Sequence, residues 1–396
     1  MKKVFIIKYA ELNTKKDNIG MFLRTLKENI ERTLEGYSVS ITFDKGRMFV
    51  SLQDEDFESI LERLQKTFGI HEIEVGYELE NHEMETIENA LISIIKESEF
   101  HTFKVETKRS YKEYPMTSLE VSKHLGGVIL KNKQGITVDV HHPEVTFFIE
   151  IRREYAYIYF ERYAGLGGYP VGTLGKGLLM LSGGIDSPVS GYLTMKRGVK
   201  LEAIYFESPP HTSVEAKNKV LSLARTLSEY GNDIKVHVIP FTHIQEAIYK
   251  SIPHDYMVTI MRRMMYRISE KIAHHNRCKI LVNGESIGQV ASQTLSSMSV
   301  INEVVTIPVI RPVACFDKLE IMDLARKIGT YETSILPYED CCTIFVPTHP
   351  VINPEHEKCV EYEALIPHEE LILEAIRNEE VISSNMKTDQ EFSEYL

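Results

Sequence analysis

The sequence predicts an α/β protein in three parts: an N-terminal ferredoxin-like module of the α+β type, a second small α/β domain, and a C-terminal doubly wound parallel sheet. Three observations predict this class. Strands and helices follow a βαββαβ order in the first 80 residues, a glycine-dense segment interrupts the pattern, and apolar strands then alternate with helices. Because a single core stops growing at about 250 to 300 residues, several domains are expected in a chain of 396 residues.

The first module is predicted from alternating apolar residues and helical periodicity. Its expected elements are a strand at 4–9, a helix at 18–34, strands at 37–43 and 47–52, a helix at 57–68 and a strand at 71–79. This order is typical of a ferredoxin-like fold, which we assign to residues 1–75.

The second domain is assigned to residues 76–164. Its expected elements are a helix at 84–98, a strand at 102–107, a helix at 118–131, and strands at 137–140, 146–152 and 155–160. Residues 101–134 hold 7 Lys or Arg against 3 Asp or Glu, with Tyr111 and Tyr114 among them. We therefore expect a local basic face for nucleic acid. Its cations are Lys104, Lys108, Arg109 and Lys112.

Residues 165–176 are rich in glycine and are expected to form the main linker, followed by a third domain at 177–396. Its apolar strands are expected at 178–181, 201–206, 234–239, 279–282 and 306–310. Their alternation with helices predicts a doubly wound parallel sheet, whose ligands bind beyond the carboxyl ends of the strands.

Composition restricts the location and the partners of the chain. No apolar run reaches the roughly 18 residues that cross a bilayer, and residues 1–7 lack the features of a secretory signal. Five cysteines do not form a disulfide framework, so a cytoplasmic protein is expected. The net charge is −12, but residues 354–396, with 12 Asp or Glu against 3 Lys or Arg, contribute −9 of it. The acidic total therefore does not exclude a nucleic-acid partner.

A short polar segment follows the first strand of the third domain: Ser182-Gly183-Gly184-Ile185-Asp186-Ser187. The two glycines let the backbone approach an anion, and the two serine hydroxyls can donate to it. Ser187 is expected to cap a helix with Pro188 at its first position, so that the positive helix end also faces the anion. Asp186 would repel phosphates unless it binds Mg²⁺ or orients them.

Other nucleotide-binding motifs fit this region poorly. A Walker A motif needs Ser or Thr after its lysine, whereas Lys176 is followed by Gly177, and a G-x-G-x-x-G motif is interrupted at Pro170. An ordinary strand-to-helix turn is the alternative to a pyrophosphate-binding loop.

The polar segment resembles the signature of the PP-loop ATP pyrophosphatases, which split ATP to AMP and pyrophosphate and so activate a carbonyl-type oxygen. Later segments resemble the 4-thiouridine tRNA sulfurtransferase family, and the likeness spans nearly the whole chain: residues 261–267, 283–294, 311–312, 317–321 and 340–342. That family begins with a ferredoxin-like module and a THUMP RNA-binding domain. The resemblance implies that ATP adenylates uridine 8 of tRNA and that sulfur then replaces its C4 oxygen.

The resemblance also implies which residues bind ATP, in addition to Ser182, Gly183, Gly184 and Ser187 of the loop. They are Met180, Leu181, Tyr205, Phe206, Arg262, Gly284 and Gln293. Lys318, in the first turn of an expected helix, would neutralise the leaving pyrophosphate. From the residues alone, Gln293 either contacts a base or caps a helix, and Arg263 and Lys271 also fit a solvated helix face.

Cys341 and Cys342 form an adjacent pair. By resemblance Cys341 is the active cysteine, which carries persulfide sulfur or resolves the attack, and Cys342 could form a disulfide with it. Zinc binding with His349, His356 and Cys359 is an alternative of poor spacing, because no C-x-x-C is present. Inert buried thiols are another alternative. No protein-held metal site is expected.

The expected partners are tRNA and a cysteine desulfurase that supplies sulfur; a homodimer and a sulfur carrier protein of the thiamine pathway are left open. Some family members carry a C-terminal rhodanese domain, but only 54 residues follow Cys342, in an acidic tail without a clear pattern, so the form without that domain is expected. In the loop at 9–16, Ala10 and Lys16 replace glycines of the family pattern.

Two other functions compete with sulfur transfer. An amidating PP-loop synthetase would need an ammonia source, and no glutaminase pattern is seen. A non-catalytic RNA-binding protein would be free to lose the residues of the loop at 182–187, which is intact.

Overall fold

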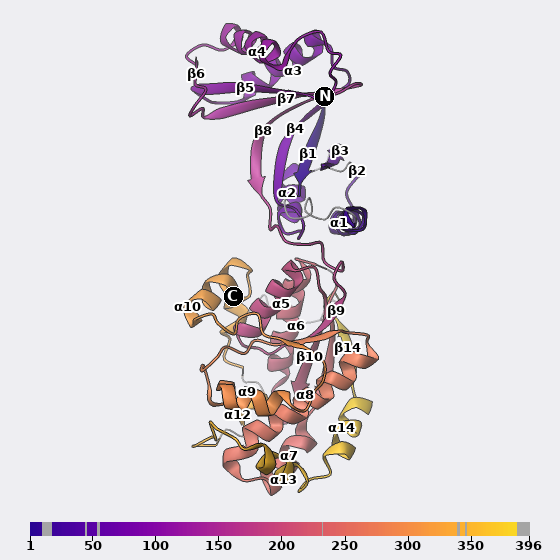
Figure 1. The fold of residues 1–396 in the computed structure, drawn as a ribbon, viewed down its shortest axis with the longest axis vertical. Coiled ribbons are helices and arrows are strands. Elements are labelled where there is room, and N and C mark those ends of the chain that lie inside the picture. Colours follow the sequence, from indigo (N-terminus) through magenta and orange to yellow (C-terminus); the bar gives the residue numbers. More distant parts are fainter. Residues whose placement is uncertain are drawn as a thin grey trace. The chain divides into compact units, whose positions relative to one another are not determined.

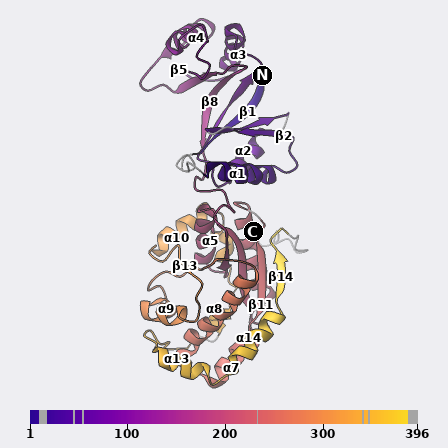
Figure 2. The ribbon, with the colours of Figure 1, turned by 45° about the vertical axis from the view of Figure 1, so that its right-hand side comes forward.

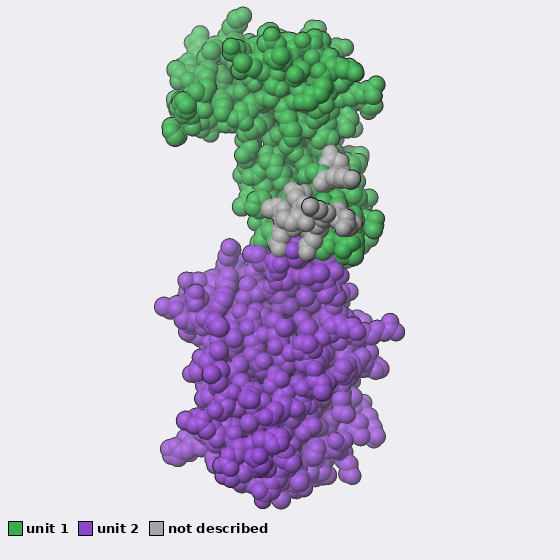
Figure 3. Space-filling view, in the orientation of Figure 1, with its two compact units in different colours: residues 1–168 green, residues 169–396 purple. Residues whose placement is uncertain are grey.

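The computed structural model describes residues 1–9, 18–43, 46–53, 56–231, 233–338, 341–344 and 347–385, the side chains of residues 342 and 343 excepted. Ala10 and Lys16 lie outside these ranges. The chain divides into two compact units, an N-terminal unit, Met1–Gly168, and a C-terminal unit, Tyr169–Leu396 (Figure 3). Within the described ranges, no helix is both long enough and apolar enough to cross a membrane.

The first half of the N-terminal unit has the predicted βαββαβ order (Figure 1). Its elements are β1 (Lys2–Lys8), α1 (Ile19–Thr33), β2 (Val39–Phe43), β3 (Arg47–Leu52), α2 (Phe57–Gln65) and β4 (Glu72–Leu79). The rings of Phe5 and Phe57 stack with centroids 4.9 Å apart, so α2 packs on the face of β1 that carries Phe5. Asp56 begins α2 by accepting a hydrogen bond from the backbone N–H of Ser59.

The second half contains the predicted second α/β domain. Its elements are α3 (Met84–Glu97), β5 (Thr102–Arg109), α4 (Ser118–Asn132), β6 (Thr137–Val138), β7 (Val145–Ile151) and β8 (Ala156–Ala164). Leu91 of α3 and Leu125 of α4 are buried against Phe103 and Ile149 of the strands. Thr117 starts α4 with a capping box, which fixes where this helix begins.

The two halves share one sheet, which the sequence pattern did not indicate. Its order is β2-β3-β1-β4-β8-β7-β5-β6, with β4 antiparallel to β8. A Cβ on Gly76 of β4 would lie 2.1 Å from the carbonyl oxygen of Ile158, so glycine permits this strand pairing. Phe49 of β3 also stacks on Tyr157 of β8 at 5.1 Å, although two strands lie between them, so their side chains meet over this face of the sheet. The ferredoxin-like module and the second domain are therefore one structural body.

The glycine-rich segment at 165–176 is divided between the two units. The N–H of Gly167 donates to the carbonyl of Ile70 at 2.7 Å, within the N-terminal unit. The N–H of Tyr169 donates to the carbonyl of Lys196 at 3.0 Å, within the C-terminal unit. Backbone hydrogen bonds therefore anchor the segment on both sides of the division between Gly168 and Tyr169.

The C-terminal unit is built on the predicted parallel sheet. Its first elements are β9 (Lys176–Met180), α5 (Asp186–Lys196), β10 (Lys200–Glu207), α6 (Val214–Ser228), β11 (Lys235–Pro240), α7 (Thr242–Ser251), a 3₁₀ turn (His254–Tyr256), α8 (Met257–His275) and β12 (Ile280–Val282). They are followed by a second 3₁₀ turn (Ala291–Gln293), α9 (Leu295–Asn302), β13 (Val309–Ile310), α10 (Lys318–Lys327), α11 (Tyr331–Ser334), α12 (Cys341–Ile344), α13 (His356–Glu363), α14 (His368–Arg377) and β14 (Glu380–Ser383). The order is β13-β12-β9-β10-β11-β14, and only β14 is antiparallel to its neighbour. This arrangement confirms the predicted doubly wound fold.

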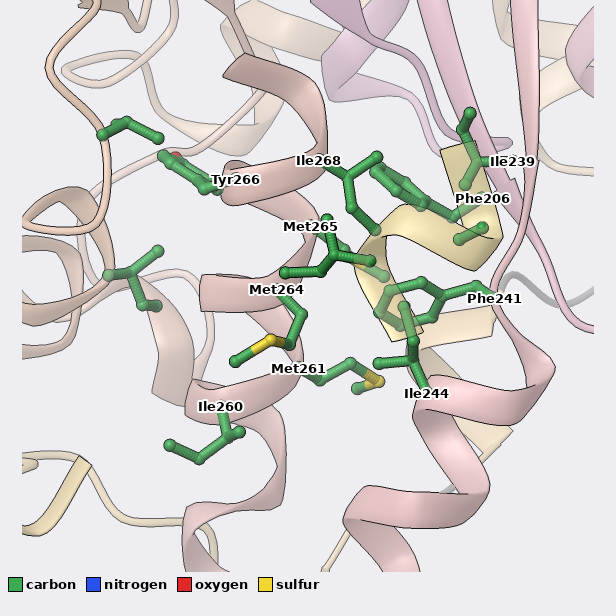
Figure 4. Packing of buried hydrophobic residues seen from close by; sticks show 14 of the residues in the cluster. Phe206, Ile239, Phe241, Ile244, Ile260, Met261, Met264, Met265, Tyr266 and Ile268 are labelled. Carbon is green, nitrogen blue, oxygen red and sulfur yellow. The ribbon is translucent and has the colours of Figure 1, made fainter. Parts of the chain in front are cut away.

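Helices cover both faces of this sheet (Figure 2). On one face α5 lies so close that a Cβ on Gly191 would be 2.8 Å from the side chain of Leu179. On the other face, Met261 and Met265 of α8 pack with Phe206 in the main hydrophobic core (Figure 4). This packing fixes α8 beside the carboxyl ends of the strands, where ligands of such sheets bind.

The prediction of a patternless tail after Cys342 is wrong for its described part. The segment forms α13, α14 and β14, and β14 extends the sheet by pairing with β11. Glu363 of α13 binds Arg263 of α8 at 2.7 Å, and both side chains are buried. Arg263 is therefore not on a solvated helix face, whereas Lys271 is exposed. The short apolar stripe that buries Ile372 is hidden in the sequence by the many acidic residues around it.

Candidate active site

A cavity of about 220 Å³ lies at the carboxyl ends of β9, β10 and β12. Its walls contain eleven residues that the sequence predicted: Met180, Leu181, Ser182, Asp186, Ser187, Tyr205, Phe206, Arg262, Gly284, Gln293 and Cys341. Four further residues, which the sequence analysis did not select, complete the lining: Ile204, Met265, Asn283 and Glu285. The fold thus brings residues from distant parts of the chain to one cavity.

The polar loop enters α5 differently from the prediction. The helix begins at Asp186, with Ile185 at the N-cap position and Pro188 third in the helix, so Ser187 is not the cap. The hydroxyl of Ser187 instead accepts a hydrogen bond from the backbone N–H of Ser182 at 3.0 Å. Because this hydroxyl turns back to the start of the loop, it stabilises the loop's shape.

Gly284 allows two loops to meet at the cavity. The N–H of Gly184 donates to the hydroxyl of Ser182 at 3.3 Å, and Gly183 lies between these two residues. A Cβ on Gly284 would lie 2.6 Å from the backbone nitrogen of Ser187, so only glycine lets the loop after β12 touch the start of α5. The N-terminal end of α5, which carries partial positive charge, is thereby held at the cavity.

Asp186 joins three separate segments at the mouth of the cavity. Its Oδ1 accepts from the Lys318 ammonium at 2.9 Å, and its Oδ2 accepts from the amide of Gln289 at 3.1 Å. Lys318 is the first residue of α10, in the first turn of a helix as predicted, and Asp317 caps that helix with a capping box. The cation and the carboxylate are partly exposed, at 44% and 19%. Both charges can therefore meet a ligand from solution.

Glu285 is the centre of a buried polar network that the sequence analysis missed. Its carboxylate accepts from Arg262, from Arg311 Nε at 2.7 Å, from the Tyr266 hydroxyl at 3.0 Å and from Asn283 Nδ2 at 2.9 Å. Burial raises the pKa of Glu285, but Arg262 and Arg311 lower it further, so its pKa stays below the ordinary value. The group is therefore an anion at neutral pH. Its position two residues beyond Asn283, in a segment already singled out, was the available signal.

Cys341 lies in the cavity wall at the start of α12 and is 3% exposed. Its backbone carbonyl accepts from the Nε2 of Gln245, a side chain of α7 that is 1% exposed, at 2.7 Å. This bond ties the cysteine-bearing segment to the core. The side chain of Cys342 lies outside the described residues.

The other described cysteines are Cys278, Cys315 and Cys359. Burial raises the pKa of the Cys278 and Cys359 thiols to about 11, which disfavours the reactive thiolate. Cys315 is exposed. Across the described ranges, no group of three or more His, Cys, Asp or Glu side chains could hold a metal ion, and His356 pairs with Glu303. The zinc alternative therefore gains no support there.

Gln293 does not cap a helix, which was one of its two alternatives. Its Oε1 accepts from the backbone N–H of Ser286 at 3.3 Å, and Thr294 is the residue that caps α9. Gln293 thus fixes the loop after β12 where that loop lines the cavity.

The four predicted cations of the N-terminal unit do not form one patch. Lys104, Lys108 and Arg109 all lie in β5, where successive side chains point to opposite faces, so Arg109 is on the other face from the two lysines. Arg109 Nη1 donates to the carbonyl of Tyr114 at 3.1 Å, and Tyr114 is buried in the core. Lys108 and Lys112 are exposed.

Three known protein families match the chain in order. Residues 4–73 match a family described as the ThiI ferredoxin-like domain, residues 81–161 match the THUMP domain, and residues 172–367 match the family described as thiamine biosynthesis protein (ThiI).

Relatives and a solved structure match over nearly the whole length. A protein of Oceanobacillus iheyensis described as a probable tRNA sulfurtransferase is 48% identical over 394 residues, which are 99% of this chain and 98% of the relative. One of Anoxybacillus flavithermus, with the same description, is 44% identical over 96% of both chains. The crystal structure of a 4-thiouridine synthetase–RNA complex with bound ATP is 37% identical, with a TM-score of 0.91, over 97% of this chain and 100% of that one.

Proposed function

Because the chain belongs to the tRNA sulfurtransferase family, we propose that it uses ATP to activate uridine 8 of tRNA and then replaces the C4 oxygen of that base with sulfur. One observation carries the proposal: the loop at 182–187 and Cys341 line the same cavity. A loop suited to phosphates and a thiol suited to sulfur transfer, side by side, support a reaction that needs both. The similar 4-thiouridine synthetase structure contains ATP and RNA, which supports these two ligands for this chain.

In the first step the C4 oxygen of uridine attacks the α-phosphate of ATP and pyrophosphate leaves. The loop N–H groups and the end of α5 hold the phosphates, and Lys318 stabilises the negative charge that develops on pyrophosphate. Arg262, Tyr205 and Phe206 line the cavity, and we assign them to contacts with the nucleotide. The product is a base whose C4 oxygen has become part of AMP, a far better leaving group.

Mg²⁺ fits this site as a companion of ATP. Asp186 presents carboxylate oxygens at the mouth of the cavity, and Mg²⁺ is commonly held by one or two carboxylates together with substrate phosphates. When bound, Mg²⁺ would neutralise phosphate charge. Lys318, which already pairs with Asp186, keeps that carboxylate in place.

In the second step the outer sulfur of a Cys341 persulfide attacks C4, the C4–O bond breaks, and AMP leaves. A second thiol, for which Cys342 is the candidate, then attacks the inner sulfur. The S–S bond to the base breaks, a disulfide remains on the enzyme, and an external dithiol reduces it. A cysteine desulfurase supplies the persulfide sulfur.

We assign tRNA binding to the N-terminal unit, which binds RNA through shape and phosphate contacts. The THUMP match at residues 81–161 and the exposed Lys108 and Lys112 support this assignment. The description of residues 172–367 as a thiamine biosynthesis protein favours a second acceptor for the same sulfur, a carrier protein of the thiamine pathway.

Pyrophosphate release from ATP, measured with and without unmodified tRNA, tests the proposal. We expect release that depends on tRNA. Release that depends on ammonia instead would indicate an amidating synthetase, and tRNA binding without release would indicate a non-catalytic protein.

A further inference from the structure

The proposed reaction leaves the buried network around Glu285 without a role. Its single carboxylate faces two guanidinium groups, so Glu285, Arg262 and Arg311 together carry a net charge of +1. Arg262 lines the cavity. Arg311 does not, and its Nη2 donates to the Oδ1 of Asn302 at 3.1 Å. The network therefore holds the guanidinium of Arg262 in the cavity wall through the carboxylate of Glu285.

We propose that Glu285 is a positioning residue for ATP activation and that it acts through Arg262. The inference rests on the proposed function, because it takes ATP as the anion that Arg262 meets. An arginine has a long side chain that must be ordered before it binds, and a fixed partner removes that cost from the binding step. The second arginine, Arg311, offsets the carboxylate so that Arg262 keeps its attraction for an anion.

The surroundings of Glu285 fit a fixed anchor better than a group that reacts. The carboxylate is 2% exposed and accepts hydrogen bonds from four side chains, including the Tyr266 hydroxyl at 3.0 Å. Its pKa lies below the ordinary value, so it does not take up a proton during turnover at neutral pH. Glu285 is therefore assigned to orientation and not to proton transfer.

Glu363 provides a matched control. It is also a buried carboxylate that binds two arginines of α8, Arg263 at 2.7 Å and Arg267 at 3.1 Å. Arg263 directly follows Arg262 in the helix, but neither Glu363 nor its two arginines are among the residues that line the cavity. Glu285→Gln thus removes a buried anion that lines the cavity, and Glu363→Gln removes one of the same kind that does not.

The experiment uses the full chain and compares Glu285→Gln, Glu363→Gln and the unchanged protein. Two quantities are measured: the rise in Tm on addition of Mg·ATP, and the KM for ATP in tRNA-dependent pyrophosphate release. Both substitutions should lower the Tm without ligand. Only Glu285→Gln should raise the KM for ATP, by roughly 10- to 100-fold, the effect of losing a hydrogen bond to a charged group, and should lose most of the ATP-dependent rise in Tm.

A wild-type chain that shows no ATP-dependent rise in Tm contradicts the proposed function itself. With that rise present, an unchanged KM in Glu285→Gln overturns the positioning role alone, and so does an equal loss of the ATP response in Glu363→Gln. If Glu285→Gln does not fold, Glu285→Asp replaces it, because aspartate keeps the charge but shortens the side chain by one methylene. A raised KM for ATP with kcat kept within about threefold supports the inference, and an unchanged KM overturns it.

Discussion

Replacing Asp186 by asparagine should separate catalysis from folding. The carboxylate binds Lys318 at 2.9 Å and Gln289 at 3.1 Å, and the two charged side chains are partly exposed. A partly exposed pair contributes about 0.2 to 1 kcal/mol to stability. In a unit that runs from Tyr169 to Leu396, a loss of 1 kcal/mol lowers the Tm by about 2 to 4 °C. The fold should therefore survive the substitution almost unchanged.

Activity should respond far more strongly. An amide lacks the negative charge that orients the metal and phosphates, so pyrophosphate release with tRNA should fall by about 100-fold or more. The assay measures pyrophosphate release and Tm on the same preparations. Asp323→Asn is the control, because Asp323 lies on α10 with Lys318 but pairs with Arg326 in an exposed contact. Release within about twofold of the wild type in Asp186→Asn would refute the reasoning, as would equal losses in both variants.

Three further predictions concern sulfur transfer, RNA binding and acid stability. Cys341→Ser should still release pyrophosphate on tRNA but form no 4-thiouridine, whereas Cys359→Ser should keep both activities; thiolation by Cys341→Ser would contradict the sulfur assignment. Lys108→Glu should weaken tRNA binding and reduce the slope of log affinity against log salt by about 1, measured by filter binding at several salt concentrations; an unchanged slope would exclude a phosphate contact. Burial raises the pKa of Glu363, but Arg263 lowers it further, so the pKa of this group in the folded protein lies below the ordinary 4.5. The ionised Glu363 therefore stabilises the folded protein above pH 4.5, and this stabilisation is lost as the pH falls through the lower folded-state pKa. As the pH is lowered from about 6 to about 3, the Tm of Glu363→Gln should therefore fall less than the Tm of the wild type, and an equal fall in both would contradict this linkage.

Local patterns predicted the parallel sheet and the loop at 182–187, whereas the family resemblance implied most of the other residues of the cavity wall. Apolar strands, the glycine loop and the acid after it are contiguous in the chain, and the fold rule places ligands at the carboxyl ends of the strands. The fold class is confirmed by the structure and by the family matches. The roles of the individual residues stay predictions until they are measured.

Features that depend on contacts between distant residues were not predictable in this way. Glu285 and Arg311 are 26 residues apart, and nothing local indicates that one carboxylate will lie between two arginines. The pairing of β4 with β8 joins two modules that each read as complete, and Gly76 had no evident reason to be glycine in the sequence alone. The cap assigned to Ser187 was wrong because its hydroxyl binds backward in the loop, a choice that only the three-dimensional loop decides.

The central claim is that one cavity performs both ATP activation and sulfur transfer on tRNA. The most direct measurement supplies the purified chain with ATP, Mg²⁺, cysteine, a cysteine desulfurase and a dithiol reductant, and counts pyrophosphate released and 4-thiouridine formed on an unmodified tRNA and on the same tRNA with cytidine at position 8. The account predicts one pyrophosphate for each 4-thiouridine on the first tRNA and no 4-thiouridine on the second. Thiolation without ATP, or equal thiolation of both tRNAs, would contradict it.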